Sequence, residues 1–379
     1  MQPIRIISPD FELLGEIDNY ESMLPVFSFH GMGSIELRIN RYKKYVEHLI
    51  KNNIIMINPR KAFIIKHREI ELDENGKITE NWLIKGLALK VVIGQRITVP
   101  PSTTAYDNKQ GNAETVMKHF IDTNVVNPVD PKRKIDNIII APNQNRGSSI
   151  SWQSRFKNLA EEISSISLNT GLGWDIHIDT QVKKWVFDVA EGKDLTANQS
   201  ENPPVIFSPQ FDSLKQLAYT ESELNYKNAA YVGGQGEGAE RRIVEFGTNT
   251  DLERHEVFID ARDVEEKDED DQPLPEQTIV QNLTDRGQQQ LNELLNEEYL
   301  EGQILTKSPF KYEVDYNLGD IVTVQNKDWL VTMDTRITEI KEIYESTGYR
   351  IEAVFGNDRP TLIKKIKQEL SQISNEVRR

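Results

Sequence analysis

The sequence predicts a protein of mixed β and α+β class, in which β-rich stretches flank a region of helices and strands. Ile35, Leu37 and Ile39 alternate with charged residues, which is the period of two expected for a strand with one buried face. Between Phe156 and Ile166 the apolar residues instead recur at helical spacing. Short apolar runs separated by turn residues return between 312 and 355, which indicates a meander of hairpins.

The first hundred residues are expected to form a small antiparallel barrel with one helix. The helix is predicted around 42–52. A hairpin turn is predicted at 73–77, because Asn-Gly tolerates the positive φ of tight turns. The strands of this region are predicted at 11–17, 35–39, 54–57, 62–72 and 81–89.

An α+β unit is expected next. Asn112 is a suitable N-cap for one helix, and Gly171 is a suitable left-handed C-cap for a second. The predicted elements are helices at 113–124 and 153–169, followed by a hairpin of strands at 174–178 and 184–189.

Strands are expected again from 205 to about 260, with the glycine-rich run 233–238 as a connection inside this region. The segment 263–276 is acidic and has almost no apolar residues, so it is predicted to be an exposed, mobile loop whose deletion leaves folding intact. The remaining predicted elements are a helix at 279–299, strands at 312–316, 321–325, 329–334, 336–346 and 349–355, and a helix from 360 to about 377.

Composition excludes several classes of function. The formal charge of −15 opposes binding to the nucleic-acid backbone, because such affinity comes from clustered Lys and Arg. There is no cysteine, which rules out disulfides and thiolate metal sites and fits a reducing cytoplasm. The sequence shows neither a secretory signal nor an apolar run of membrane-spanning length, so a soluble product without membrane insertion is expected.

No motif in the sequence carries recognisable chemistry, so no catalytic, cofactor-binding or metal-binding residues are predicted. The glycine run lies between two strands and lacks the spacing of a dinucleotide loop. His67 and His177 fall in predicted strands, where a solvent-facing position explains them better than a metal does. The histidines stand at 30, 48, 67, 119, 177 and 255, without the short spacings of helical zinc sites.

Several segments resemble the tail-hub family of long-tailed phages and prophages of Gram-positive bacteria, whose members occur at the baseplate hub or tail tip and as N-terminal modules of tail-associated proteins. The resemblance spans nearly the whole chain. Its segments are LGEIDNYES at 14–22, GSIELRI at 33–39, WLIKG at 82–86, WQSRFKNL at 152–159, GLGWD at 171–175, NPPVIFS at 202–208, YVGGQGEG at 231–238, LTDRG at 283–287 and YNLGDIV at 316–322.

This resemblance implies two tube-type antiparallel β-barrels per chain, with α+β insertions, and a homotrimer that presents a pseudo-sixfold ring to the distal tail ring. The implied partners are the distal tail protein ring, the tape measure protein and tail fibre or receptor-binding proteins. Viral DNA is expected to pass without specific binding, the subunit to assemble in the host cytoplasm, and the virion tail tip to be its final location.

The same resemblance gives a division of the chain into six segments. They are a first β-barrel with one helix at 1–105, an α+β insertion at 106–200, the start of a second β unit at 201–262, an acidic loop and helix insertion at 263–305, the completion of the second barrel at 306–357, and a C-terminal helix at 358–379.

The leading hypothesis is a non-enzymatic structural subunit. The alternative is a tail-tip protein that binds the host cell wall or degrades peptidoglycan, but the chain stops after a short helix, so such activity is expected on another polypeptide. The charge of −15 leads to one further expectation. Residues that face the centre of the ring should be mainly acidic or neutral polar, since cationic walls would hold DNA.

Overall fold

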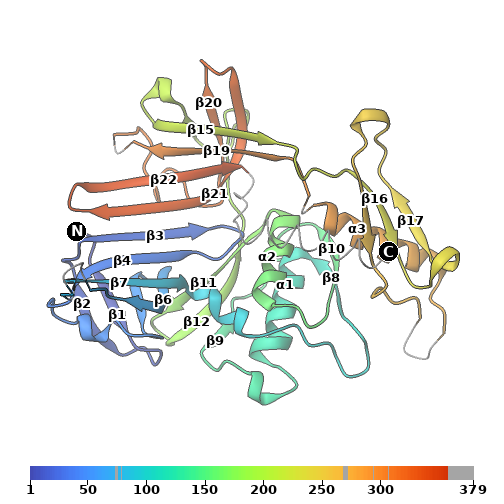
Figure 1. The fold of residues 1–379 in the computed structure, drawn as a ribbon, viewed down its shortest axis with the longest axis horizontal. Coiled ribbons are helices and arrows are strands. Elements are labelled where there is room, and N and C mark those ends of the chain that lie inside the picture. The colour runs from blue at the N-terminus through green and yellow to red at the C-terminus, as the bar shows by residue number, and fades with distance from the viewer. Residues whose placement is uncertain (73–75, 78, 268–271, 293, 306, 357–379) are drawn as a thin grey trace. The chain divides into compact units, whose positions relative to one another are not determined.

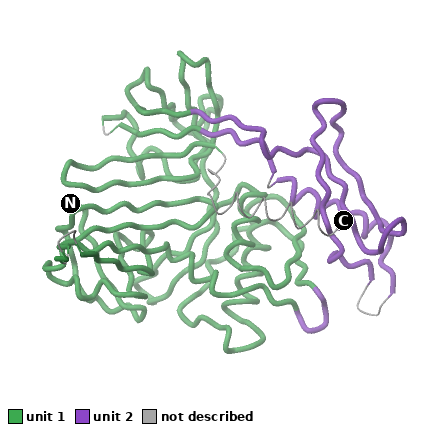
Figure 2. Tube along the Cα trace, in the orientation of Figure 1, with its two compact units in different colours: residues 1–100, 106–218, 300–356 green, residues 101–105, 219–299, 357–379 purple. Residues whose placement is uncertain are grey.

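The computed structural model describes residues 1–72, 76–77, 79–267, 272–292, 294–305 and 307–356. They form two compact units, coloured separately in Figure 2. The first unit comprises residues 1–100, 106–218 and 300–356, and the described part of the second comprises 101–105 and 219–299. The helix predicted at 360–377 and most of the hairpin turn predicted at 73–77 lie outside the described residues.

The N-terminal strands of the first unit lie in the order β3-β4-β7-β6-β5-β1-β2 (Figure 1). Ile35, Leu37 and Ile39 of β4 are all buried, which confirms the predicted alternation. The strands are β1 (Ile4–Ile7), β2 (Leu13–Ile17), β3 (Ser22–Ser28), β4 (Ser34–Asn40), β5 (Ile54–Asn58), β6 (Lys61–Glu69) and β7 (Asn81–Ala88). Strands β1 and β3 were not predicted from the sequence, and Pro25 in the middle of β3 explains why that strand has no clear signal.

The helix predicted at 42–52 is wrong. This stretch contains only turns and one short 3-10 turn, η1 (Val46–His48). Tyr45 and Asn52 adopt φ values of 69° and 73°, which an α-helix cannot contain. Val46 and Leu49, whose spacing resembles that of a helix, are both buried in the core below the sheet.

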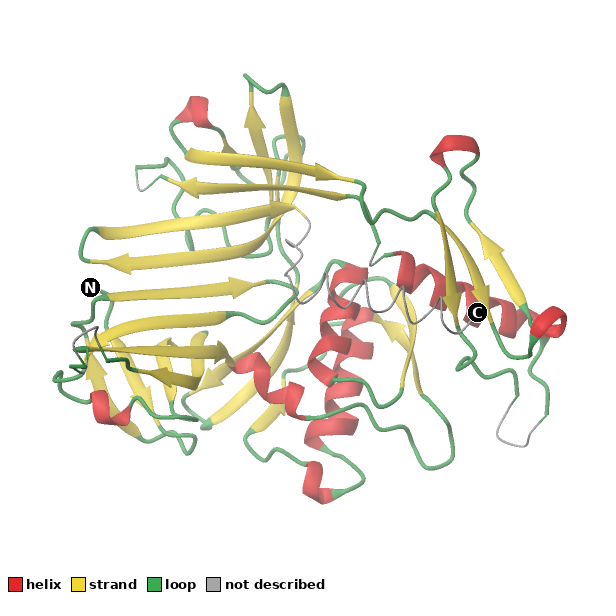
Figure 3. Ribbon diagram, in the orientation of Figure 1, coloured by secondary structure: helices red, strands yellow, loops and turns green. Residues whose placement is uncertain are grey.

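The C-terminal strands continue the same sheet, because β21 pairs antiparallel with β3. The result is one curled sheet of 14 strands that contains both ends of the first unit (Figure 3). Its remaining strands are β13 (Asp194–Leu195), β14 (Ile206–Phe207), β15 (Leu214–Ser222), β19 (Glu297–Ile304), β20 (Ile321–Asn326), β21 (Val331–Glu345) and β22 (Gly348–Gly356). The division of this sheet into two barrels stays a prediction.

Two details of the predicted meander differ from the structure. The strands predicted at 329–334 and 336–346 are one long strand, β21, which pairs with β20 over its first half and with β22 and β3 over its second. The strand predicted at 312–316 is absent, since this stretch forms turns in which Glu313 has a φ of 66°. Strand β21 therefore belongs to two parts of the sheet, one with β20 and one with β22 and β3. The two halves of β21 meet at a bulge near Thr338.

The α+β region packs its own core against one face of the N-terminal strands. Asn112 accepts a hydrogen bond from the backbone of Thr115 at 2.8 Å and Gly171 has a φ of 70°, so both predicted caps are confirmed. The elements are η2 (Leu89–Gln95), β8 (Asp107–Asn112), α1 (Ala113–Ile121), the π-helical turn η3 (Asp122–Val126), η4 (Pro131–Arg133), β9 (Ile138–Ile140), β10 (Ser149–Ser154), α2 (Leu159–Thr170), β11 (Gly173–Asp179) and β12 (Lys184–Ala190).

The second predicted helix begins later than expected. Residues 149–154 form β10, which pairs with β8, and α2 begins only at Leu159. The side chain of Asn158 accepts hydrogen bonds from the first backbone amides of α2, which fixes its start. The predicted hairpin of β11 and β12 is confirmed by their antiparallel pairing.

Residues 54–56 of β5 and 61–65 of β6 are buried on both faces. In β5, Ile55 belongs to the core enclosed by the curled N-terminal strands, whereas Ile54 and Met56 belong to the core shared with α1 and α2. Such strands cannot show a clear alternation of apolar and polar residues. The α+β region therefore covers the outer face of these strands.

The loop between β3 and β4 joins three parts of the first unit. The backbone amide of Phe29 donates to the carbonyl of Thr338 in β21, and its carbonyl accepts from the amide of Trp174 in β11. A Cβ at Gly173 or Gly319 would lie about 2.2 or 2.1 Å from the Phe29 ring, so only glycine fits at either position. Both glycines lie in segments with which the sequence resembles tail hubs.

Polar contacts hold the next residues of this loop. His30 and Ser167 of α2 form a buried side-chain hydrogen bond of 2.7 Å, and the indole N–H of Trp174 donates to the His30 carbonyl at 2.7 Å. The ammonium of Lys90 donates to the Ser28 carbonyl at 2.7 Å. The loop therefore fixes the α+β region to the middle of the sheet.

A buried ion pair spans the junction between the N-terminal and C-terminal strands. Lys61 at the start of β6 and Glu342 in β21 are 7 % and 1 % exposed, and the Nζ to Oε1 distance is 2.5 Å. Glu313 and Tyr344 complete the cluster, with Glu313 2.9 Å from the ammonium and the Tyr344 hydroxyl donating to Glu342 at 2.9 Å. Two charges that are 281 residues apart are thus neutralised in the interior.

The described part of the second unit contains a three-stranded sheet with helix α3 on it. The order is β17-β16-β18, and the apolar side of α3 packs on the sheet through Ile279, Leu283 and Leu291. Its elements are β16 (Ala229–Gly233), η6 (Gly238–Glu240), β17 (Ile243–Phe246), η7 (Asp251–Glu253), β18 (Glu256–Asp260) and α3 (Glu276–Leu291). The predicted helix ends earlier than expected because Glu297–Ile304 forms β19, the partner of β15.

Replacing Lys61 by Met should lower the free energy of unfolding by about 3–5 kcal/mol, because Glu342 would remain buried with an uncompensated charge. The double variant Lys61→Met/Glu342→Leu should recover most of this loss. Denaturant unfolding of the two single variants and the double variant measures the coupling. A double variant as unstable as the sum of the single variants would contradict the assigned role of the pair.

Candidate functional site: a sheet face with paired charges

The two histidines in predicted strands, His67 and His177, lie in β6 and β11. His67 is exposed and lies 3.1 Å from Glu69, which confirms its solvent-facing position. His177 is half-buried in β11, and burial, followed by the nearby charge of Arg60, lowers the pKa of its imidazole. Within the described part of the chain, no group of three or more His, Asp or Glu residues could hold a metal ion.

The glycine-rich run connects β16 and β17, as predicted, and its geometry differs from that of a phosphate loop. The Arg241 guanidinium donates to the carbonyls of Gly233 and Gly234, at 2.9 and 3.1 Å. The amide of Gly234 donates to the carbonyl of Arg242. Phosphate loops present free backbone amides to the ligand, whereas here an arginine occupies the carbonyl side of the turn.

The acidic segment is anchored where it begins. Val264 is fully buried, Asp263 accepts from Arg286 of α3 at 2.7 Å, and Glu266 accepts from Arg242 at 3.2 Å. The prediction of an exposed loop is therefore wrong for this part of 263–276. The acidic residues at 268–271 lie outside the described residues.

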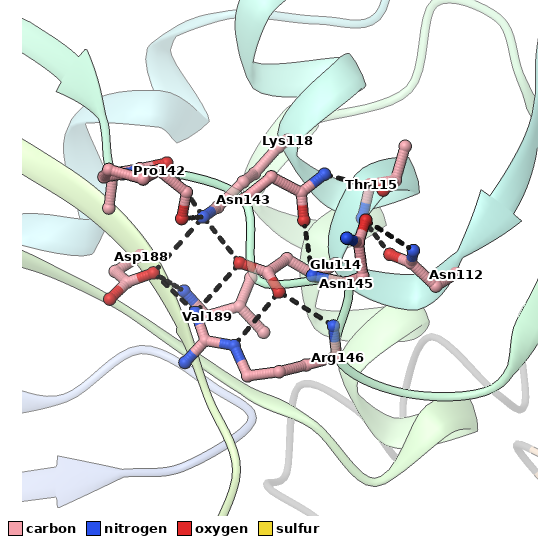
Figure 4. Close-up of polar contacts among 11 residues, drawn as sticks. Asn112, Glu114, Thr115, Lys118, Pro142, Asn143, Asn145, Arg146, Asp188 and Val189 are labelled. Atoms are coloured by element: carbon pink, nitrogen blue, oxygen red, sulfur yellow. Dashed lines mark hydrogen bonds and ion pairs between the residues drawn. The ribbon is translucent and has the colours of Figure 1, made fainter.

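A compact cluster of four charged residues lies between α1, the loop after β9, and β12 (Figure 4). Glu114 is completely buried and accepts from Lys118 at 2.6 Å. Arg146 binds both carboxylate oxygens of Glu114, at 3.0 and 2.9 Å, and also donates to Asp188 at 2.8 Å. Two acids and two bases thus neutralise one another.

The hydrogen-bonding capacity of this cluster is taken up inside the protein. The Lys118 ammonium also donates to the carbonyls of Ala141 and Pro142, at 2.9 Å each. Burial alone would raise the pKa of Glu114, but hydrogen bonds from Arg146 and Lys118 lower it to about 2. A general base needs a pKa near the working pH and access to substrate, and Glu114 has neither. The cluster therefore fixes the loop 141–146 onto α1.

A polar surface of the first unit lies across five neighbouring strands, β7, β4, β3, β21 and β22, and is named here the five-strand face. The register gives its members. Glu36 and Arg38 lie opposite Lys85 and Leu83, on the face away from buried Leu37. The same alternation places Val26 of β3 and Lys341 of β21 next to each other on this face.

Charges on the five-strand face are balanced and paired. It carries four acidic and four basic residues, so its net charge is zero. The acids are Glu36, Glu339, Glu345 and Glu352, and the bases are Arg38, Lys85, Lys341 and Arg350. Lys341 and Glu352 form an ion pair of 3.1 Å, as do Arg350 and Glu345, while Glu36 lies 3.5 Å from Arg38 and 3.9 Å from Lys85.

Between these charges the five-strand face carries aliphatic side chains. Leu24 and Val26 of β3 lie between the charged residues of β4 and those of β21. The face thus has no run of adjacent basic side chains, which is what a phosphate backbone would bind. Sequence alternation predicts the outer positions of β4, but the order of the five strands, and with it this face, follows only from the structure.

No helix in the described residues is long and apolar enough to cross a membrane.

Comparison with known proteins identifies the family. Residues 3–357 match the family model described as Siphovirus ReqiPepy6 Gp37-like protein. No curated protein matches the sequence.

Solved structures share the fold at low sequence identity. The 43 kDa tail protein of prophage MuSo2 from Shewanella oneidensis is 10 % identical with a TM-score of 0.56, and the match covers 93 % of this chain and 98 % of that one. The tail protein from Neisseria meningitidis MC58 is 12 % identical with a TM-score of 0.54, covering 94 % and 96 %. Prophage tail protein gp18 from Listeria monocytogenes EGD-e is 12 % identical with a TM-score of 0.51, covering 99 % and 100 %.

The family match covers nearly the whole chain and its fold is shared with tail proteins of known structure, so this chain belongs to the Siphovirus ReqiPepy6 Gp37-like protein family.

Proposed function

We propose that the chain is a tail-hub subunit that closes the distal end of a phage tail tube as a homotrimeric ring. In this role it links the distal tail ring to tip or fibre proteins and forms part of the channel through which DNA leaves. Family membership and the fold support a place in the tail. The sequence resemblance to tail hubs supports the more specific place at the tip.

The observation that carries the proposal is the five-strand face. A channel wall for DNA needs a continuous surface without strong attraction for phosphates, since each cationic contact adds affinity through counterion release. This face extends over strands from both ends of the chain, and its four basic residues are balanced by four acidic ones. It therefore fits the expectation of a wall that is neutral rather than basic.

The absence of chemistry is part of the proposal. The charge cluster around Glu114 has its charges paired and the carboxylate of Glu114 inaccessible. The alternative of a peptidoglycan hydrolase needs two carboxylates at a fixed separation that flank a substrate. Glu114 and Asp188 are instead bridged by the same arginine.

The remaining parts of the proposal concern location and partners. The subunit assembles in the host cytoplasm and ends in the virion tail tip, in contact with the distal tail protein ring, the tape measure protein and tail fibre or receptor-binding proteins. Residues 1–105 would supply the first tube-type barrel and residues 201–262 with 306–357 the second, while 106–200 and 263–305 would supply the insertions that decorate the ring.

The structural role of the Glu114 cluster predicts a specific pH dependence. The pKa of Glu114 falls from 4.5 to about 2 on folding, so its contribution is present above pH 4.5 and is lost as the pH falls toward 2. That shift corresponds to about 3 kcal/mol. Glu114→Gln should lower the free energy of unfolding strongly at pH 7, and the difference from wild type should shrink on acidification.

The matched control is Glu201→Gln, because Glu201 is exposed. Denaturant unfolding from pH 7 to pH 3 measures both variants. A Glu114→Gln variant as stable as wild type at pH 7 would show that the cluster does not hold the loop.

The purified chain should neither clear a peptidoglycan suspension nor sediment with host cell walls. The physical reason is that Glu114 is buried and that both acids of its cluster are paired with the same arginine. A known muramidase provides the positive control. Clearing of the suspension, or binding to walls without other tail proteins, would contradict the structural function. It would favour the alternative of a protein that binds the cell wall or degrades peptidoglycan.

A further inference from the structure

An exposed apolar projection stands at the turn between β20 and β21. Leu330 is 92 % exposed and Trp329 is 46 % exposed. Phe211, at the end of η5 (Pro209–Phe211), lies beside this turn and is 49 % exposed. These three side chains are named here the knob. Tryptophan and neighbouring apolar groups on a surface are typical of protein interfaces.

The knob is held in a fixed conformation. The side-chain oxygen of Asn326 accepts from the amides of Asp328 and Trp329, at 3.0 and 3.3 Å, and the Gln210 amide donates to Asp328 at 3.2 Å. The Lys327 ammonium lies 5.5 Å from the centre of the Phe211 ring. Ordering of the turn before association reduces the entropy lost on binding.

Leu330 is strained in the free subunit. Its φ of 55° lies in the left-handed region, where a leucine is unfavourable. Glycine would suit this backbone better, and the leucine side chain has almost no contact within the chain. Its presence is explained if the side chain contacts another molecule.

A hollow lies at the other end of the same strand. Its volume is about 640 Å³, and it is lined by Gln2, Tyr344, Ser346 and Tyr349 among others. The rings of Tyr344 and Tyr349 lie 4.8 Å apart, and Tyr349 is 40 % exposed. A hollow of this size, within the range of about 300–1,000 Å³ for small-molecule sites, accommodates an aromatic and an aliphatic side chain.

Strand β21 separates the knob from the hollow. It begins at Val331, next to the knob, and ends at Glu345, beside the hollow, which is roughly 50 Å of strand at about 3.3 Å per residue. Both halves of β21 are hydrogen-bonded to neighbouring strands, so the two ends cannot approach each other within one chain. Contact between a knob and a hollow therefore requires two copies.

Charged residues beside the two surfaces are complementary. The turn of the knob carries Lys327 and Asp328, and the hairpin at the hollow carries Glu345 and Arg350. A lysine can thus meet a glutamate, and an aspartate can meet an arginine. Pairing at the rim of an interface favours one orientation of the partners.

We propose that the knob of one subunit inserts into the hollow of the next copy of the same chain, with Trp329 and Leu330 packed against Tyr344 and Tyr349. Such a head-to-tail contact uses two different surfaces and closes into a ring when the rotation between copies permits. The inference rests on the proposed ring and identifies its contact surface.

Site-specific disulfide cross-linking tests the contact, and the chain suits it because it contains no cysteine. Leu330→Cys and Ser346→Cys are prepared as separate full-length variants, mixed at high concentration and oxidised. One cysteine lies on the knob and the other on the rim of the hollow, so covalent dimers should form only in the mixture. The double variant should form closed trimers.

The control replaces Leu330→Cys by Val129→Cys, because Val129 is 97 % exposed but lies away from the knob in the loop after η3. That mixture should give no dimer above background. Absence of a cross-link between positions 330 and 346 at all concentrations would overturn the proposed contact. If the protein nevertheless had the mass of a trimer, the trimer would stand and only the contact would be overturned. Cross-linked open chains or rings of another size would keep the contact and overturn the trimer.

A second variant separates association from folding. Leu330→Gly removes the side chain and relieves the backbone strain, so thermal stability should stay equal or rise, while the dissociation constant between copies should increase roughly tenfold or more. Analytical ultracentrifugation over a concentration series measures the constant. An unchanged constant together with an unchanged fold would overturn the role of Leu330.

Discussion

The pairing of β3 with β21 is the constraint on which the first unit depends. It joins strands from the N-terminal and C-terminal parts of the sequence into one sheet. In the strand order, β3 and β21 are the neighbours at which the two parts meet. The buried pair of Lys61 and Glu342 lies at this junction, where each charge compensates the other in the interior. The sheet is thereby continuous from the N-terminal to the C-terminal strands.

The loop from Phe29 to Gly33 connects this junction of the sheet to the α+β region through hydrogen bonds and packing contacts. Phe29 packs against Gly173 and Gly319, which come from different parts of the chain, and its backbone bonds reach both β11 and β21. Because residues 54–56 of β5 and 61–65 of β6 are buried on both faces, the α+β region cannot move away without exposing a core. The α+β region thus covers the outer face of the sheet at β5 and β6, and the balanced charges of the five-strand face lie farther along the same side.

Local physical chemistry could predict the elements whose signals lie in adjacent residues. The alternation around Leu37 and the capping role of Asn112 are such signals, and both are present in the structure. The helix expected at 42–52 is wrong because the backbone of Tyr45 is left-handed, and the side chain of Tyr45 packs against the core of the N-terminal strands. Lys61 and Glu342 are 281 residues apart, so nothing in the sequence could relate them, and the knob and hollow likewise required the course of β21.

The central proposal is that this protein forms the ring at the tail tip and that its five-strand face lines the channel. A map of the assembled tail tip, into which the first unit can be placed, tests it most directly. The account predicts three copies around the axis, with Glu36, Lys85, Lys341 and Glu352 facing the centre. One, two or six copies, or a channel wall with an excess of Lys and Arg, would contradict it.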